Sequence, residues 1–164
     1  MNKARYAFAV LAGIASAALP VLLFAQSGPS APTAAPYRPG LGDLMTMTVQ
    51  PRHIKLGLAA RENNWSYAAY ELHELEEAFE RVTRHSPQWR KKPIAEMMAS
   101  VTKEPMAALE VAIKAGDATR FAAAYTQLTE ACNTCHQSAE VGVIAIQAPE
   151  GNPFPDQDFR PGKR

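Results

Sequence analysis

The strongest constraint on the fold of this chain is the pentapeptide Cys132-Asn133-Thr134-Cys135-His136, which contains both of its cysteines. This C-x-x-C-H spacing is typical of covalent haem c attachment, in which two nearby thiols add across the vinyl groups of one haem and the next imidazole reaches the iron. On a helix, residues three and four apart project from one side. The motif therefore predicts a helix here, one covalent haem c on Cys132 and Cys135, and His136 as an iron ligand.

Three other readings of the motif compete with haem attachment. A disulfide between Cys132 and Cys135 would be strained inside a helix and would close a very small loop. A zinc site needs about four ligands, so the motif would require a fourth from a glutamate or another histidine. A thioredoxin-like redox pair requires a βαβ context, which is not visible in the sequence. Haem attachment is the leading hypothesis, and zinc, a disulfide or free thiols remain as alternatives.

The N-terminal segment, residues 1–25, has the features of an export signal. Lys3 and Arg5 provide a positive start, an apolar run follows, and Leu23-Phe24-Ala25 is a candidate cleavage site. We therefore predict a periplasmic protein, which agrees with the assembly of haem c outside the cytoplasm. The alternative is an uncleaved membrane anchor, because the run is about long enough to span a bilayer.

The rest of the chain divides into three parts. Residues 26–40 are rich in Pro, Ala, Ser and Gly and are predicted to be a flexible linker. Residues 41–147 are predicted to form one folded domain, and residues 148–164 an irregular tail that either packs on the domain through Phe154 and Phe159 or stays disordered. Without the signal segment the chain has 15 basic and 16 acidic residues, so nothing indicates a nucleic-acid partner.

The domain is predicted to be all-α, because apolar residues recur with helical spacing and strand signals are absent. Asn64 and Asp117 are candidate N-caps. Pro51 is predicted to kink or restart the first helix, and Pro105 to break or restart the third. The four predicted helices run from Leu41 to Asn63, from Asn64 to Ser86, from Pro93 to Gly116, and onward from Asp117.

Apolar stripes on two of these helices predict their buried faces. Both have the spacing of helices that pack in a bundle. The stripe of the second helix consists of Trp65, Ala68, Leu72, Leu75, Phe79 and Val82. The stripe of the last helix consists of Phe121, Tyr125, Leu128, Cys132, Cys135, Ala139 and Val143. Because both cysteines lie on this seam, the haem is predicted to sit inside the bundle. Five glutamates of the second helix are predicted to be a solvated face or, alternatively, a docking site: Glu71, Glu74, Glu76, Glu77 and Glu80.

A C-x-x-C-H motif on the last of four helices resembles the class II c-type cytochromes, the cytochrome c-prime group. The resemblance covers residues 41–147 and rests on the motif, its late position and the number of helices. It implies an antiparallel four-helix bundle with haem c on the last helix and His136 as proximal ligand. It also implies redox partner proteins and, as an option, a homodimer formed through the first two helices. The chain departs from the group at Glu140, where a basic residue is usual, so the haem propionates must find partners elsewhere.

The residue of the first helix that faces the iron decides the function in the resembling group. A methionine there gives a six-coordinate electron carrier, whereas an apolar residue leaves the iron open to NO or CO. The first helix of this chain offers Met45, Met47 and His53. Three hypotheses remain open: ligation by His53, ligation by Met45 or Met47, or no distal ligand.

His53 is the favoured distal ligand because imidazole binds iron well, and its neighbours Arg52 and Lys55 suit haem propionates. Its alternative role is that of a solvated surface residue. The sequence contains no catalytic constellation or phosphate-binding loop, so we do not expect an enzyme. The leading prediction is an exported one-electron carrier. The alternatives are a five-coordinate gas-binding cytochrome and a non-redox metal-binding module.

Overall fold

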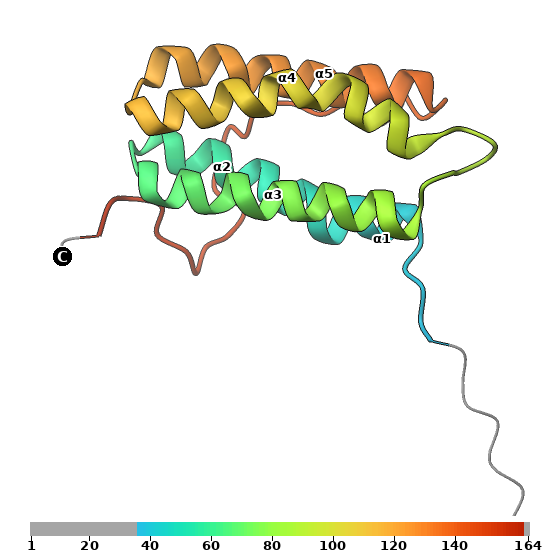
Figure 1. Cartoon of the computed structure of the whole chain (residues 1–164). Coiled ribbons are helices and arrows are strands. Elements are labelled where there is room, and N and C mark those ends of the chain that lie inside the picture. The colour runs from blue at the N-terminus through green and yellow to red at the C-terminus, as the bar shows by residue number, and fades with distance from the viewer. Residues whose placement is uncertain (1–35, 163–164) are drawn as a thin grey trace, which may run out of the picture. The chain divides into compact units, whose positions relative to one another are not determined.

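All four predicted helical segments are present in the computed structural model, which describes residues 36–162 (Figure 1). No strand occurs in this part of the chain, and none of its helices is long and apolar enough to cross a membrane. The predicted signal segment and most of the linker lie outside the described residues. The elements are α1 (Leu41–Leu44), η1 (Met45–Val49), α2 (Gln50–Arg61), α3 (Trp65–His85), α4 (Ile94–Ala115) and α5 (Ala118–Ser138).

The first helical segment consists of α1, η1 and α2 in direct succession. Its middle part, η1, is a π-helical turn, and Pro51 lies in the first turn of α2 directly after it. Proline lacks an N–H donor and crowds the carbonyl four residues earlier, so a wider turn at this point relieves both problems. The restart predicted at Pro51 is therefore confirmed.

Pro105 behaves differently, because α4 continues through it without a break. The predicted break is wrong. Pro105 and its neighbour Met106 are both buried in the core. Their apolar packing offsets the helical hydrogen bond that the proline cannot donate.

The ends of the helices follow local capping chemistry. Asn64 Oδ1 accepts a hydrogen bond from the Tyr67 amide at 3.2 Å, and Asp117 Oδ1 accepts one from the Arg120 amide at 3.0 Å. Both predicted N-caps are confirmed. Gly116 ends α4 with a φ of 62°, a left-handed conformation that glycine adopts without steric cost.

The last helix ends earlier than its apolar stripe predicted. α5 stops at Ser138, and Glu140 then adopts a positive φ of 63°. Val143 lies beyond this turn with 95% of its surface exposed, so its assignment to the buried seam is wrong. The turn at Glu140 then brings the chain back beside α5, where the Ile146 amide donates to Asn133 Oδ1.

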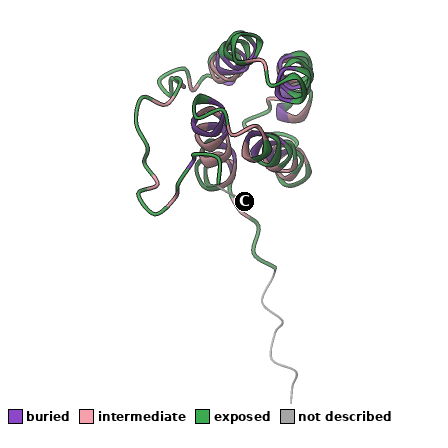
Figure 2. Cartoon of the chain, turned by 90° about the vertical axis from the view of Figure 1, so that its left-hand side faces the viewer, coloured by how far each residue is buried: buried purple, intermediate pink, exposed green. Residues whose placement is uncertain are grey.

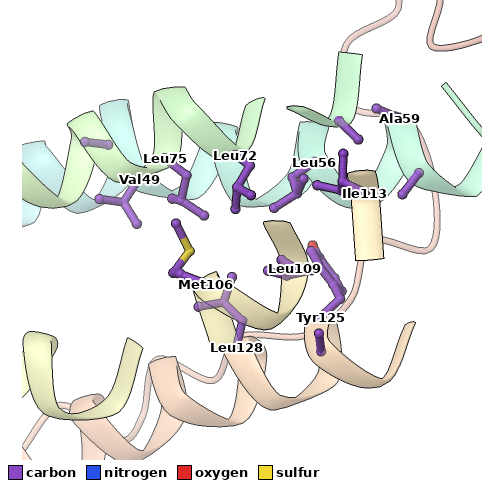
Figure 3. Close-up of a cluster of buried hydrophobic side chains, with 14 of the residues drawn as sticks. Val49, Leu56, Ala59, Leu72, Leu75, Met106, Leu109, Ile113, Tyr125 and Leu128 are labelled. Carbon is purple, nitrogen blue, oxygen red and sulfur yellow. The ribbon is translucent and has the colours of Figure 1, made fainter. Parts of the chain in front are cut away.

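The helices pack in two layers, with α2 beside α3 and α4 beside α5 (Figure 1). Their buried faces point inward (Figure 2). Leu56, Leu75, Leu109 and Leu128 are fully buried and meet between the layers (Figure 3). The predicted stripe of α3 is confirmed, because its members are either buried or packed partly exposed against this core.

The C-terminal tail packs on the bundle through both predicted aromatic residues. Phe159 is buried and stacks on Tyr67, with ring centroids 5.3 Å apart. Phe154 lies under the Lys55 ammonium, which is 4.7 Å from the ring centroid. Asn64 Nδ2 also donates a 3.1 Å hydrogen bond to the Phe159 carbonyl. The tail therefore covers part of α2 and α3.

Candidate cofactor-binding site

The three motif side chains, Cys132, Cys135 and His136, line a cavity of about 230 Å³. The end of α5 and the α3–α4 connection, which both contribute to it, lie at the same end of the bundle (Figure 1). The other walls are mainly apolar and come from the first helical segment, the α3–α4 connection, α4 and the residues after α5. The apolar lining residues are Leu41, Met45, Val49, Phe79, Trp89, Ile94, Met98, Val141, Ile144 and Ile146.

The two cysteines are free and half-buried. Burial, together with the neighbouring Cys135, raises the pKa of Cys132 to about 11, and burial also raises the pKa of Cys135. Both are therefore thiols at neutral pH. The disulfide alternative is not found in residues 36–162, which include both cysteines. The zinc alternative lacks its ligands there too, since no three His, Cys, Asp or Glu side chains in that range are grouped to hold a metal ion.

His136 has one ring nitrogen engaged by the backbone. Its Nδ1 lies 2.7 Å from the Ile144 carbonyl oxygen. A carbonyl can only accept, so Nδ1 carries the proton and Nε2 carries the lone pair. Metal-binding histidines show this same arrangement, in which a carbonyl fixes the tautomer and the orientation of the ring. His136 is thus prepared to bind a metal through Nε2.

His53 has both ring nitrogens engaged by α5. Its Nε2 lies 3.0 Å from Thr129 Oγ1, and its Nδ1 lies 3.1 Å from the Tyr125 hydroxyl. The Thr129 hydroxyl already donates to the Tyr125 carbonyl at 2.9 Å, so it accepts from His53 Nε2–H. The Tyr125 hydroxyl is then the donor, and its single proton is shared between Nδ1 and the His53 carbonyl, which is 2.8 Å away. The rings of Tyr125 and His53 also stack at 4.6 Å.

This network bears on both roles predicted for His53, the iron ligand and the solvated surface residue. With 4% of its surface exposed, it is not a solvated residue, so that alternative is wrong. Burial lowers its pKa to about 4, which keeps the imidazole neutral. His53 does line the cavity, but binding iron would require it to lose a hydrogen bond to Tyr125 or Thr129. The structure therefore leaves it no free nitrogen for a metal.

The two candidate methionines face different ways. Met45 lines the cavity and packs against the core, whereas Met47 is 74% exposed. Residues two apart on a helix project to different sides, which accounts for the contrast. Met98 of α4 also lines the cavity and is buried. Met45 is therefore the one candidate of the first helical segment that brings a free ligand atom to the site.

The structure does not bring Arg52 and Lys55 to the cavity. Arg52 spans to α3, with Nη1 3.2 Å from Glu71 Oε2 and Nη2 3.0 Å from Glu74 Oε2. Glu71 is almost fully buried, so its assignment to a solvated face is wrong. Burial raises the pKa of Glu71, while Arg52 opposes this rise. Lys55 contacts the tail through Phe154.

Two basic residues of the α3–α4 connection lie next to the cavity lining instead, although neither lines the cavity itself. Trp89 lines the cavity, and the Arg90 guanidinium lies 4.2 Å from the centroid of its ring. Lys92 Nζ lies 2.8 Å from Glu140 Oε1 and thereby places a positive charge beside the position where the resembling group has its own basic residue. The sequence analysis missed these residues, although the run from Arg90 to Lys92 was a visible signal.

Comparisons of the chain with protein-family models, with curated proteins and with solved structures found no match. The assignment of a function therefore rests on the motif and the geometry around it. Three features of that geometry fit a haem: two unpaired thiols, an imidazole with its Nε2 available, and a mainly apolar cavity that all three side chains line.

Proposed function

We propose that the protein is an exported c-type cytochrome with one haem bound covalently to Cys132 and Cys135 and with His136 as proximal ligand. In this proposal the four helices form the antiparallel bundle of the class II group, with the haem on α5. The observation that carries it is that all three motif side chains line one apolar cavity. When bound, the haem supplies one-electron exchange between ferric and ferrous iron, tuned by its axial ligands and burial.

Electron transfer is the favoured activity because Met45 can complete the coordination. Its thioether lies on the same cavity as His136, and His/Met ligation is typical of electron-carrying cytochromes c. Two protein ligands in both oxidation states limit reorganisation during transfer. Arg90 and Lys92 are proposed to neutralise the propionates in place of Arg52 and Lys55, since Arg90 stacks on Trp89, which lines the cavity, and Lys92 pairs with Glu140, whose neighbours Ala139 and Val141 line it.

The absorption spectrum of the reduced protein, with and without CO, tests this function. The protein should be produced in a host that matures haem c. Sharp, split visible bands that CO leaves unchanged support the carrier. Rapid and complete CO binding would favour the five-coordinate, gas-binding alternative. A colourless protein would overturn the haem assignment.

Export to the periplasm is also part of the proposal and rests on residues 1–25 and on where haem c is assembled. Cell fractionation, with the mass of the mature chain, tests it. A periplasmic protein that lacks the first 25 residues supports a cleaved signal. A membrane-bound protein of full length would support the anchor instead, and a cytoplasmic protein would contradict export.

A further inference from the structure

The chain after α5 turns back and lies along the motif. We call residues 141–147 the return segment. It follows the turn at Glu140, and Val141, Ile144 and Ile146 of this segment line the cavity. The residues that hold it in place therefore also influence the site.

Asn133, one of the two residues between the cysteines, binds the return segment through both the oxygen and the nitrogen of its side-chain amide. Its Oδ1 accepts a 2.7 Å hydrogen bond from the Ile146 amide, and its Nδ2 donates a 2.9 Å bond to the Ile146 carbonyl. The other residue between the cysteines, Thr134, is exposed and donates only to the Glu130 carbonyl of its own helix. The two residues are adjacent, but Asn133 binds the return segment and Thr134 does not.

Ile146, which Asn133 binds, lies two residues after the residue whose carbonyl orients His136. That carbonyl belongs to Ile144 and lies 2.7 Å from His136 Nδ1. Besides this bond, the return segment makes two backbone hydrogen bonds on the N-terminal side of Ile144: the Val141 amide donates to the His136 carbonyl at 2.8 Å, and the Ile144 amide donates to the Val141 carbonyl at 2.9 Å. An exposed turn alone is a weak support for a fixed acceptor. The two bonds to Asn133 restrain the segment on the C-terminal side of Ile144, where no other hydrogen bond of residues 145–147 is found.

We propose that Asn133 is a positioning residue that holds the return segment so that the Ile144 carbonyl fixes the proton and the orientation of His136. This inference rests on the proposed haem-binding function. A hydrogen bond at Nδ1 makes the imidazole a more basic ligand, which stabilises ferric iron and lowers the reduction potential.

Asn133→Ala and Thr134→Ala test this role in the full-length, haem-loaded protein. Both variants keep the cysteines and the histidine. Three properties are measured: the reduction potential, the exchange rate of the His136 Nδ1 proton by NMR, and the rate of proteolysis within residues 141–147. Asn133→Ala should raise the potential and should speed both rates by about tenfold or more, because it removes both hydrogen bonds to Ile146. Thr134→Ala should match the wild type.

Asn133→Asp is the second variant, because it keeps an acceptor for the Ile146 amide, loses the donor to the Ile146 carbonyl and adds a negative charge. Its proton-exchange and proteolysis rates should lie between those of the wild type and Asn133→Ala, and these two rates replace those of Asn133→Ala if that protein does not fold. Equal values for the Asn133 variants and Thr134→Ala, in proteins that all carry haem, would overturn the positioning role alone. A wild-type protein without haem would overturn the proposed function instead.

Discussion

Two histidines line the same cavity in very different surroundings, His53 on the side of α2 and His136 at the end of α5. The region around His53 is closed, because Thr129 and Tyr125 engage both ring nitrogens. The region around His136 is open, because one carbonyl engages Nδ1 and leaves Nε2. The contrast teaches that burial beside a cavity does not make a histidine a ligand; the decisive property is a nitrogen with no partner.

The closed region has the character of a structural core. Its polar groups satisfy one another, and within residues 36–162 no buried side-chain nitrogen or oxygen lacks a partner. The open region instead brings together side chains that can bind a metal or a cofactor, namely two thiols, two thioethers and an imidazole. Each prediction below tests whether the region around His53 contributes to the stability of the fold and the region around His136 binds the iron.

His136→Ala should have the largest effect. The haem should stay attached through the cysteines, but the low-spin spectrum should be lost completely, because the iron loses its proximal ligand. Absorption and electron paramagnetic resonance spectra measure this change. His73→Ala is the control, since His73 is exposed on α3 and pairs only with Glu77. An unaltered low-spin spectrum in His136→Ala would remove His136 from the site.

Met45→Ala should have the next largest effect. It should remove the second axial ligand, so that the near-infrared sulfur-to-iron band of the ferric protein disappears and CO binds the ferrous protein. Met47→Ala is the matched control and should leave both properties unchanged, because Met47 faces solvent. If the two variants behave alike, Met45 does not bind the iron.

His53→Ala should affect stability and not ligation. The variant leaves a cavity and deprives the Thr129 and Tyr125 hydroxyls of a partner, which should cost about 2–4 kcal/mol of unfolding free energy. Denaturant titration measures this loss, and the exposed His85→Ala should stay within about 0.5 kcal/mol of wild type. A stable His53→Ala protein with a high-spin spectrum would restore His53 as the ligand.

The smallest predicted effect is a dependence of stability on pH. The pKa of His53 is about 4 in the folded protein and 6.5 when unperturbed, so in the window between them the unfolded chain binds the extra proton. Stability is therefore fully present above this window and falls as pH drops through it, by at most roughly 3 kcal/mol. Denaturant titrations across this range should show a smaller slope in His53→Gln than in wild type. Equal slopes would mean that His53 does not titrate in this way.

Local signals in the sequence predicted most of the fold. Helical spacing and the caps at Asn64 and Asp117 act over a few residues, so the helices and their starts could be predicted. The continuation of α4 through Pro105 could not be, because it depends on packing against other helices. Nor could the end of α5, since the turn at Glu140 requires a positive φ that sequence rules assign mainly to glycine.

The candidate site could be predicted only in part, for the same reason. Cys132, Cys135 and His136 are neighbours in the chain, and their spacing alone indicates their chemistry. The burial of His53 depends on Thr129 and Tyr125, which are 76 and 72 residues away. No periodic pattern links such distant residues.

The intact mass of the purified protein under denaturing conditions tests the central claim most directly. For protein from a host that matures haem c, we predict the mass of the polypeptide plus one haem, with no thiol left to titrate. Cys132→Ala combined with Cys135→Ala should lose the added mass. The mass of the bare polypeptide, with two reactive thiols, would contradict the account.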